Sequence, residues 1–302
     1  AHAHSAQDAA VALRPDRRAV PSRRGLRFTP VLRTRILTAL VIFPVTLAVV
    51  FLATPLVFKL AIAVLLLVGC LEFRRICDLP AAAGAALLAL QAVIFGALLF
   101  GWARIEPNAT AILGAACLAW LLLFVRLPLF RRGAQPTAAF RWAGFVSAPV
   151  VLTACWFALS WLQEQPRGEG VVFLLLLIIW ASDIGAYFSG KQFGRRKLAP
   201  VISPNKTWEG VYGGLALALL VAWLWAGPIT GLGIPLTALA VMSVVTTLSS
   251  IGGDLFISLH KRTVGVADAG RLFPGHGGVL DRYDSLLAGA PFFALAFGVL
   301  AQ

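Results

Sequence analysis

Several carboxylate side chains of this sequence stand inside or directly beside strongly apolar stretches. Asp183 interrupts the apolar run of residues 174–187, and Asp254 follows two glycines near the end of another run. Asp281 and Asp284 stand at the start of the last apolar run. An ionised carboxylate in hydrocarbon costs on the order of a few kcal/mol or more. Each of these acids is therefore expected to face a polar cavity, a cation or a partner side chain.

Carboxylates that converge on one cavity indicate the chemistry to expect there. Crowded carboxylates repel one another unless cations hold them together. Hard oxygen ligands of this kind suit Mg²⁺, which also binds phosphate oxygens. The four aspartates therefore predict a Mg²⁺ site that acts on a phosphate compound, and the number of cations, one or two, stays open.

Two further segments supply groups that a polyphosphate needs. Residues 203–207 (SPNKT) place hydroxyls and an ammonium group just before an apolar run, and the N-terminus of a helix favours an anion. Residues 273–278 (FPGHGG) contain three glycines, which let backbone amides approach a ligand with no Cβ in the way. Lys261 and Arg262 add fixed positive charge, and an arginine can contact a phosphate through two N–H groups.

Each of these features also has a purely structural explanation. Basic residues in loops fix membrane topology, and a Ser-Pro pair before a helix is an ordinary start signal. A glycine-rich turn with one histidine commonly only connects two elements. Asp183 alone could be the partner of a buried hydroxyl or arginine. The prediction of a site therefore depends on all of these features meeting at one face of the membrane.

The elements that must position these residues are membrane-spanning helices. The 302-residue chain is 59% hydrophobic and only 13% charged, with a mean hydropathy of +0.85, which is not typical of a water-soluble domain. A spanning helix needs roughly 20 mostly apolar residues. Nine stretches come near this length, namely 36–54, 56–73, 81–102, 109–127, 143–162, 170–189, 210–227, 233–257 and 284–301. The predicted fold is an all-α polytopic integral membrane protein with about nine transmembrane helices.

The formal charge of +13 could indicate a nucleic-acid partner, but the placement of the basic residues favours a membrane. Nearly all of them lie in alternate gaps between the apolar stretches, and only Arg104 and Arg167 fall in the opposite gaps. By the positive-inside rule, the N-terminus and the two long C-terminal loops are cytoplasmic. We therefore expect membrane lipids, and no nucleic acid, as partners.

This topology brings the four aspartates to one face. The sixth and eighth stretches run from outside to inside, so Asp183 and Asp254 lie toward the cytoplasmic surface. Asp281 and Asp284 open the ninth stretch from that same surface. The sequence therefore predicts one shallow cytoplasmic cavity that all four carboxylates share.

The chain divides into three predicted regions. Residues 1–34 are rich in Ala, Pro and Arg and are predicted to be a disordered basic cytoplasmic tail. Residues 35–165 form an N-terminal transmembrane region, and residues 166–302 form a C-terminal catalytic transmembrane region with two cytoplasmic loops. The four cysteines lack paired metal-ligand spacing and are predicted to be free packing thiols.

The residues between about 180 and 285 form a long composite pattern. Its parts are 182–187 (SDIGAY), 203–210 (SPNKTWEG), 253–255 (GDL), 258–262 (SLHKR), 268–270 (DAG) and 274–285 (PGHGGVLDRYDS). In this order they closely resemble the signature of the CDP-diacylglycerol synthases, also called phosphatidate cytidylyltransferases. The first half of the chain resembles that family only as a succession of apolar spans.

The resemblance implies a homodimeric membrane enzyme, in a bacterial inner or plasma membrane, that transfers a cytidylyl group from CTP to phosphatidic acid. The products would be CDP-diacylglycerol, used for phospholipid synthesis, and pyrophosphate. In that family's pattern, Asp254 and Asp281 match metal-binding positions. Positions that bind substrate phosphate are matched by Ser258 with Lys261 and Arg262, and by Ser203 with Lys206. The predicted catalytic residues are Asp254, Asp281, Lys261 and Arg262. The predicted substrate-binding residues are Ser203, Lys206, Thr207, Ser258, Asp268, Arg271, His276, Gly277, Gly278 and Arg282. The predicted metal-binding residues are Asp254, Asp281, Asp183 and Asp284.

One position departs from the family pattern. The family ordinarily has a lysine immediately before the aspartate that is Asp268 here, whereas this chain has Ala267. If that ammonium group contacts a phosphate, its loss removes about 1.5–3 kcal/mol of charge-assisted hydrogen bonding. Arg271 is the nearby cation that could compensate.

Other functions fit some of the same residues. A CTP-dependent lipid kinase, or a cytidylyltransferase for another lipid phosphate, would use a similar site. A cation-coupled membrane transporter also carries acids within its spans, but it predicts acids near mid-membrane and two related halves. In this chain the acids lie toward one face and gather in the C-terminal half only.

Overall fold

The structure, a computed structural model, describes residues 30–131, 133–275 and 277–301, with side chains from Thr38 onward. The predicted basic tail falls almost entirely outside the described residues, as does His276. Residues 30–34, the described end of that region, are helical as the start of α1, and the prediction for residues 1–29 is not tested.

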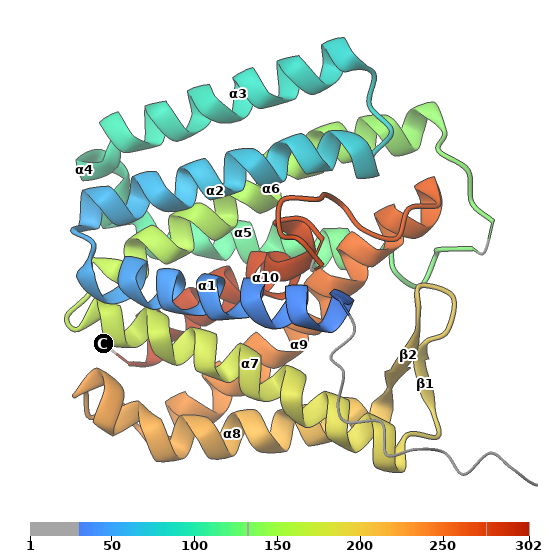
Figure 1. Cartoon of the computed structure of the whole chain (residues 1–302). Coiled ribbons are helices and arrows are strands. Elements are labelled where there is room, and N and C mark those ends of the chain that lie inside the picture. Colours follow the sequence, from blue (N-terminus) through green and yellow to red (C-terminus); the bar gives the residue numbers. More distant parts are fainter. Residues whose placement is uncertain (1–29, 132, 276, 302) are drawn as a thin grey trace, which may run out of the picture.

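Helices make up almost all of the described chain. They are α1 (Pro30–Leu52), α2 (Pro55–Ile76), α3 (Ala81–Phe100), α4 (Trp102–Ile105), η1 (Glu106–Asn108), α5 (Ala109–Phe124), α6 (Ala138–Gln163), α7 (Gly168–Phe193), α8 (Trp208–Thr230), α9 (Leu236–Val264) and α10 (Leu280–Leu300). The long helices lie side by side, with α3 and α8 at opposite edges and α9 and α10 between them (Figure 1). The predicted all-α membrane fold is confirmed.

One small β-hairpin interrupts the helical pattern. Strands β1 (Lys197–Ala199) and β2 (Ser203–Thr207) pair antiparallel, with Ala199 opposite Ser203. The hairpin lies at one end of the bundle, and the C-terminus lies at the other (Figure 1). The sequence predicts only a loop here, because the strands are too short to show an alternating pattern.

Eight described helices are long and apolar enough to cross a membrane. They correspond to the second to ninth predicted stretches, and α4, η1 and α5 together supply one of them, Trp102–Phe124. The described apolar part of α1, Thr38–Leu52, is shorter than a full span, so the count of nine is not confirmed. The eighth stretch continues as helix to Val264, because Lys261 and Arg262 are favourably placed near the negative end of the helix dipole.

Helices α7 and α8 approach each other so closely that their backbones touch at glycines. A Cβ built on Gly185 would lie 2.5 Å from the carbonyl oxygen of Gly213, and one on Gly170 would lie 2.5 Å from the carbonyl oxygen of Ile229. Small residues are the usual means of such close packing in membranes, where little hydrophobic force drives helices together. Because Gly185 lies two residues after Asp183, this contact fixes the height of Asp183 along the bundle relative to α8.

Helices α9 and α10 make a similar contact near the aspartates. A Cβ on Gly253 would lie 2.5 Å from the carbonyl oxygen of Asp284. Because Gly253 directly precedes Asp254, this close approach places Asp254 beside the first turns of α10.

The four cysteines are buried and free, as predicted: Cys70, Cys77, Cys117 and Cys155. Burial raises the pKa of the Cys77 thiol, at the end of α2, to about 12. The thiolate form of Cys77 is therefore scarce at neutral pH, and a packing role is sufficient to explain the residue.

We predict that Gly185→Ala destabilises the protein, since the new methyl group would meet the backbone of α8. Overpacking of this kind typically costs about 1–3 kcal/mol, which exceeds the gain of roughly 0.5–1 kcal/mol from replacing a helical glycine. The matched control is Gly114→Ala in α5, where a Cβ would meet nothing within 4 Å. In detergent, the melting temperature should fall for Gly185→Ala and stay level or rise for Gly114→Ala. If Gly185→Ala melted at the temperature of the wild type, α7 and α8 could move apart at this point without loss of stability.

Candidate active site

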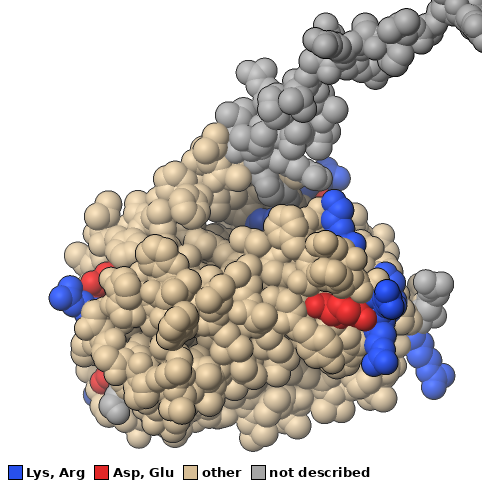
Figure 2. Space-filling model, turned by 90° about the horizontal axis from the view of Figure 1, so that it is seen from below, with Lys and Arg blue, Asp and Glu red and all other residues tan. Residues whose placement is uncertain are grey.

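The predicted site residues gather at the hairpin end of the bundle. There α7 and α9 end, α8 and α10 begin, and residues 265–279, called the 265–279 loop below, connect α9 to α10 (Figure 1). Figure 2 shows most of the visible Lys and Arg side chains at this end, while the broad middle of that face shows no Lys, Arg, Asp or Glu. This distribution is typical of a membrane protein with one strongly basic face.

Asp254 lies between two polar partners. Its Oδ2 is 2.7 Å from the ammonium Nζ of Lys206 on β2, and its Oδ1 accepts a hydrogen bond of 3.1 Å from the Ser258 hydroxyl one turn later on α9. Both charged side chains of this pair remain about one quarter exposed. The pair therefore joins the hairpin to α9 while staying accessible to a ligand.

Asp281 is more deeply enclosed and holds the 265–279 loop in place. Its Oδ1 accepts from Lys261 Nζ at 2.8 Å, and its Oδ2 accepts from the backbone N–H groups of Ala269 and Gly278, both at 2.8 Å. The side chain of Asp281 is only 5% exposed. Gly277 has a positive φ of 85°, which brings the Gly278 amide round to this carboxylate.

The other two predicted carboxylates lie beside these pairs. Asp284 is close enough to feel the charges of Asp254, Lys261 and Lys206, and one of its oxygens accepts from the Ser285 N–H at 2.8 Å. Asp183 interacts electrostatically with Lys206 and Asp254. The structure thus brings Asp183, Asp254, Asp281 and Asp284 together around two lysines at one end of the bundle.

The other predicted phosphate-binding residues have more varied positions. Arg262 donates from Nε to the carbonyl oxygen of Ile202 at 3.2 Å, which ties the end of α9 to the hairpin. Thr207 caps α8, because its hydroxyl accepts from the Gly210 N–H at 3.1 Å. Ser203 is partly exposed on β2, within reach of solvent.

The remaining predicted residues belong to the 265–279 loop or follow it directly. Asp268, Arg271 and Arg282 are exposed, Gly277 is partly exposed and Gly278 is buried. Ala267, which replaces the family's lysine, is also exposed and stands two residues before the Ala269 amide that binds Asp281.

Glu72 on α2 also belongs to this region, although it is not among the predicted site residues. Its two carboxylate oxygens accept from the N–H groups of Val279 and Leu280 at 2.9 and 2.8 Å, and so cap the N-terminus of α10. A Cβ on Gly270 or Gly278 would lie within about 2.2 Å of this carboxylate. The sequence does carry a signal for Glu72, and it is the same as for Asp183: an acid inside a predicted apolar span.

The donor groups of the site suit a hard divalent cation. Mg²⁺ typically uses one or two protein carboxylates and completes its shell with water and substrate phosphates. Among the described residues, no three His, Cys, Asp or Glu side chains lie so that they could hold a metal ion together, so the protein alone offers at most one or two such ligands to a cation. Four carboxyl groups and two ammonium groups share this end, so carboxylate oxygens remain there that a divalent cation could bind.

Comparisons with known proteins agree with the signature in the C-terminal half. Residues 33–300 match the model of the cytidylyltransferase family. A phosphatidate cytidylyltransferase of Pseudomonas aeruginosa is 37% identical over 87% of this chain and 96% of its own length. Proteins with the same name from Haemophilus influenzae and Bacillus subtilis are 34% and 33% identical, over 87% and 86% of this chain and 97% and 96% of their own lengths.

We predict that Glu72→Gln loosens the 265–279 loop. Glutamine keeps the shape but has one acceptor oxygen in place of two, and its NH₂ group would face a backbone N–H. The free energy of unfolding should fall by about 1.5–3 kcal/mol, the usual size of a hydrogen bond to a charged group. Denaturation in detergent measures this, and protease cleavage within the loop should become faster.

The control for this variant is Glu106→Gln in η1, at the opposite end of the bundle. It should unfold and be cleaved like the wild type. If Glu72→Gln also behaves like the wild type in both measurements, the contact of Glu72 with α10 does not stabilise the loop.

Proposed function

The chain belongs to the cytidylyltransferase family, and from that premise we propose that it transfers a cytidylyl group from CTP to phosphatidic acid. The products are CDP-diacylglycerol and pyrophosphate. The observation that carries this proposal is the gathering of four carboxylates and two lysines at one end of a membrane bundle. A water-soluble triphosphate and a membrane-bound phosphate can meet only at such an end.

The reaction is a substitution at the α-phosphorus of CTP. A phosphate oxygen of phosphatidic acid forms the new P–O bond, while the bond between the α-phosphorus and the bridging oxygen breaks and pyrophosphate leaves. The attacking oxygen is already an anion, so no strong general base is needed. Catalysis of this kind depends chiefly on positioning and on charge stabilisation. In this proposal His276 accordingly donates a hydrogen bond to a phosphate or anchors the loop, and it is not the base.

The lysines are the groups that exchange partners during the reaction. Lys206 and Lys261 are held ready on Asp254 and Asp281, both within hydrogen-bond distance. Their ammonium groups can turn toward phosphate oxygens, because a lysine side chain is long and flexible. Arg262, anchored to the hairpin through Nε, presents the rest of its guanidinium as a further phosphate contact.

Asp254 and Asp281 are the side chains that would hold Mg²⁺, with Asp183 and Asp284 beside them. Bound Mg²⁺ would supply positive charge to the phosphate oxygens. The protein's own part is to keep the carboxylates close through the glycine contact of α9 with α10 and to hold the loop through Asp281.

The orientation and assembly of the protein are part of the same proposal. The eight apolar helices make it an integral membrane protein, and the excess of basic residues at the site end supports a cytoplasmic active site. The bacterial relatives support a bacterial inner or plasma membrane as its location. The homodimer rests on the family resemblance alone.

The test of the function is turnover by the purified protein in detergent with CTP, phosphatidic acid and Mg²⁺. We predict formation of CDP-diacylglycerol and pyrophosphate in equal amounts. Asp254→Asn should lower this turnover by roughly 10²–10³-fold, the usual effect of removing a group that stabilises developing charge. The control is Asp78→Asn, at the same end of the bundle but paired with Arg141 outside the site. A protein that makes no CDP-lipid refutes the function, and full activity of Asp254→Asn removes that residue from the site.

We also predict that Ala267→Lys raises the activity. The new ammonium group would stand in the exposed 265–279 loop, next to the backbone that binds Asp281. One charge-assisted contact with phosphate corresponds to about one to two orders of magnitude in kcat/KM. Ala267→Gln, which has a similar length but no charge, is the control and should show little gain. An unchanged kcat/KM for Ala267→Lys would mean that no substrate phosphate reaches this part of the loop.

A further inference from the structure

An apolar groove runs along the bundle beside the candidate active site. Its cavity of about 430 Å³ lies between α1, α2, α7 and α10, within the range of roughly 300–1,000 Å³ that is usual for ligand pockets. Among the residues that line it, only Thr46 and Tyr283 have polar side chains, and these two hydrogen-bond to each other. The groove therefore offers no free polar side chain to a ligand and suits a hydrocarbon.

The length of the groove matches one leaflet of a membrane. It is lined by α1 from Val41 to Val50 and by α2 from Phe58 to Val68. At about 1.5 Å of rise per residue, these stretches are about 14 and 15 Å long. That is half of a hydrocarbon layer of about 30 Å, so the groove has the length of a single acyl chain that lies along the bundle axis.

The groove begins at the candidate active site. Its lining includes Leu272 and Phe273 of the 265–279 loop and Tyr283 of α10. Tyr283 directly precedes Asp284, and successive residues of an α-helix point about 100° apart. The first turns of α10 thus carry Asp284 of the carboxylate cluster on one face and line the groove with Tyr283 on another.

Aromatic contacts hold α1 against α7 along the side of the groove. The rings of Phe43 and Trp180 are 5.7 Å apart, and those of Phe51 and Phe173 are 5.2 Å apart. Figure 1 shows α1 lying between α2 and α7. The groove is therefore closed along its α7 side.

We propose that the groove binds one acyl chain of the phosphatidic acid substrate, with the phosphate headgroup at the end where Tyr283 and Asp284 lie. The inference rests on the proposed function. Because a lipid chain leaves one apolar medium for another, the groove gains little from hydrophobic burial. Its effect is to orient the lipid, so that the attacking phosphate stands at the carboxylate cluster whenever the chain is in place.

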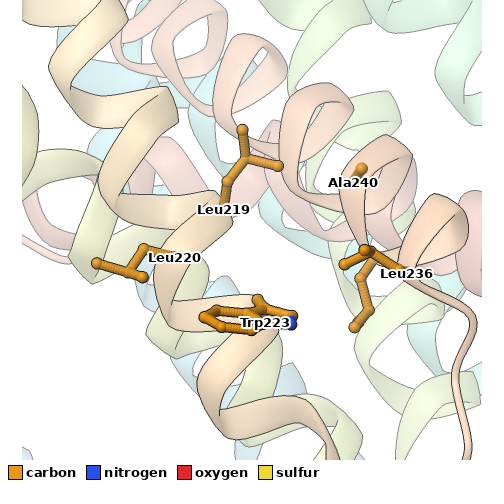
Figure 3. Close-up of a pocket in the computed structure, with 6 residues that line it drawn as sticks. Leu219, Leu220, Trp223, Leu236 and Ala240 are labelled. Carbon is orange, nitrogen blue, oxygen red and sulfur yellow. The ribbon is translucent and has the colours of Figure 1, made fainter.

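A second apolar hollow provides the matched control. It lies between α8 and α9, where Leu219, Leu220 and Trp223 face Leu236 and Ala240 (Figure 3). None of its lining residues belongs to the 265–279 loop or to α10. Ala61 in the groove and Ala240 in this hollow are both partly exposed alanines on long helices.

The experiment compares the full-length wild type, Ala61→Trp and Ala240→Trp in detergent, each with dihexanoyl and dipalmitoyl phosphatidic acid. The indole of Ala61→Trp fills the middle of the groove. We expect kcat/KM for the dipalmitoyl lipid to fall about tenfold or more relative to the dihexanoyl lipid, whose short chains need only the mouth of the groove. For Ala240→Trp the ratio of the two values should equal that of the wild type.

The outcomes separate this inference from the proposed function. A wild type that makes no CDP-lipid from either substrate refutes the function and the inference with it. An active wild type whose substrate ratio is unchanged in Ala61→Trp shows that the groove holds only bulk lipid, and it overturns the inference alone. If Ala61→Trp does not fold, Val64→Trp on the exposed side of the groove takes its place, and an unchanged ratio there has the same meaning.

Discussion

Charged groups at the edge of a membrane need partners of opposite charge, and this constraint organises the hairpin end of the bundle. Asp254 pairs with Lys206 and Asp281 pairs with Lys261, so that each acid has a base from another part of the chain. The Lys261–Asp281 pair is largely buried, and removing one member of a buried pair typically costs about 3–5 kcal/mol, because the other charge is left without compensation. The hairpin, α9 and the 265–279 loop are thereby held in one arrangement. When a phosphate takes the lysine of a pair and a cation takes its aspartate, both charges keep a partner.

Close backbone packing makes these charge pairs possible. The glycine contacts between α7 and α8 and between α9 and α10 bring four helix ends together. With larger residues at Gly185 or Gly253, the helices would stand farther apart and the aspartates would not share one set of lysines. The apolar body of the protein therefore determines the spacing of its polar end.

The sequence predicted much of this arrangement, because the signals were local. Apolar stretches of nearly the right length marked the helices, and the alternation of basic gaps indicated which end carries Asp183, Asp254 and Asp281. The pairing of individual residues could not be predicted in the same way. The amide contacts of Asp281, the β-hairpin around Ser203 and the cap on α10 depend on how distant segments meet, and no periodicity in the chain records that.

The contact of Glu72 with α10 has a consequence for the order in which the protein is built. Residues Glu72 and Leu280 are separated by more than two thirds of the chain, yet the first provides the acceptors for the backbone of the second. Chains are synthesised from the N-terminus, so α2 reaches the bilayer with its carboxylate long before the ribosome has made α10. The last helix thus inserts beside a docking position that already exists, and a chain that begins after α2 would lack it. The early helices thus help to position the last helix, in addition to holding the protein in the membrane.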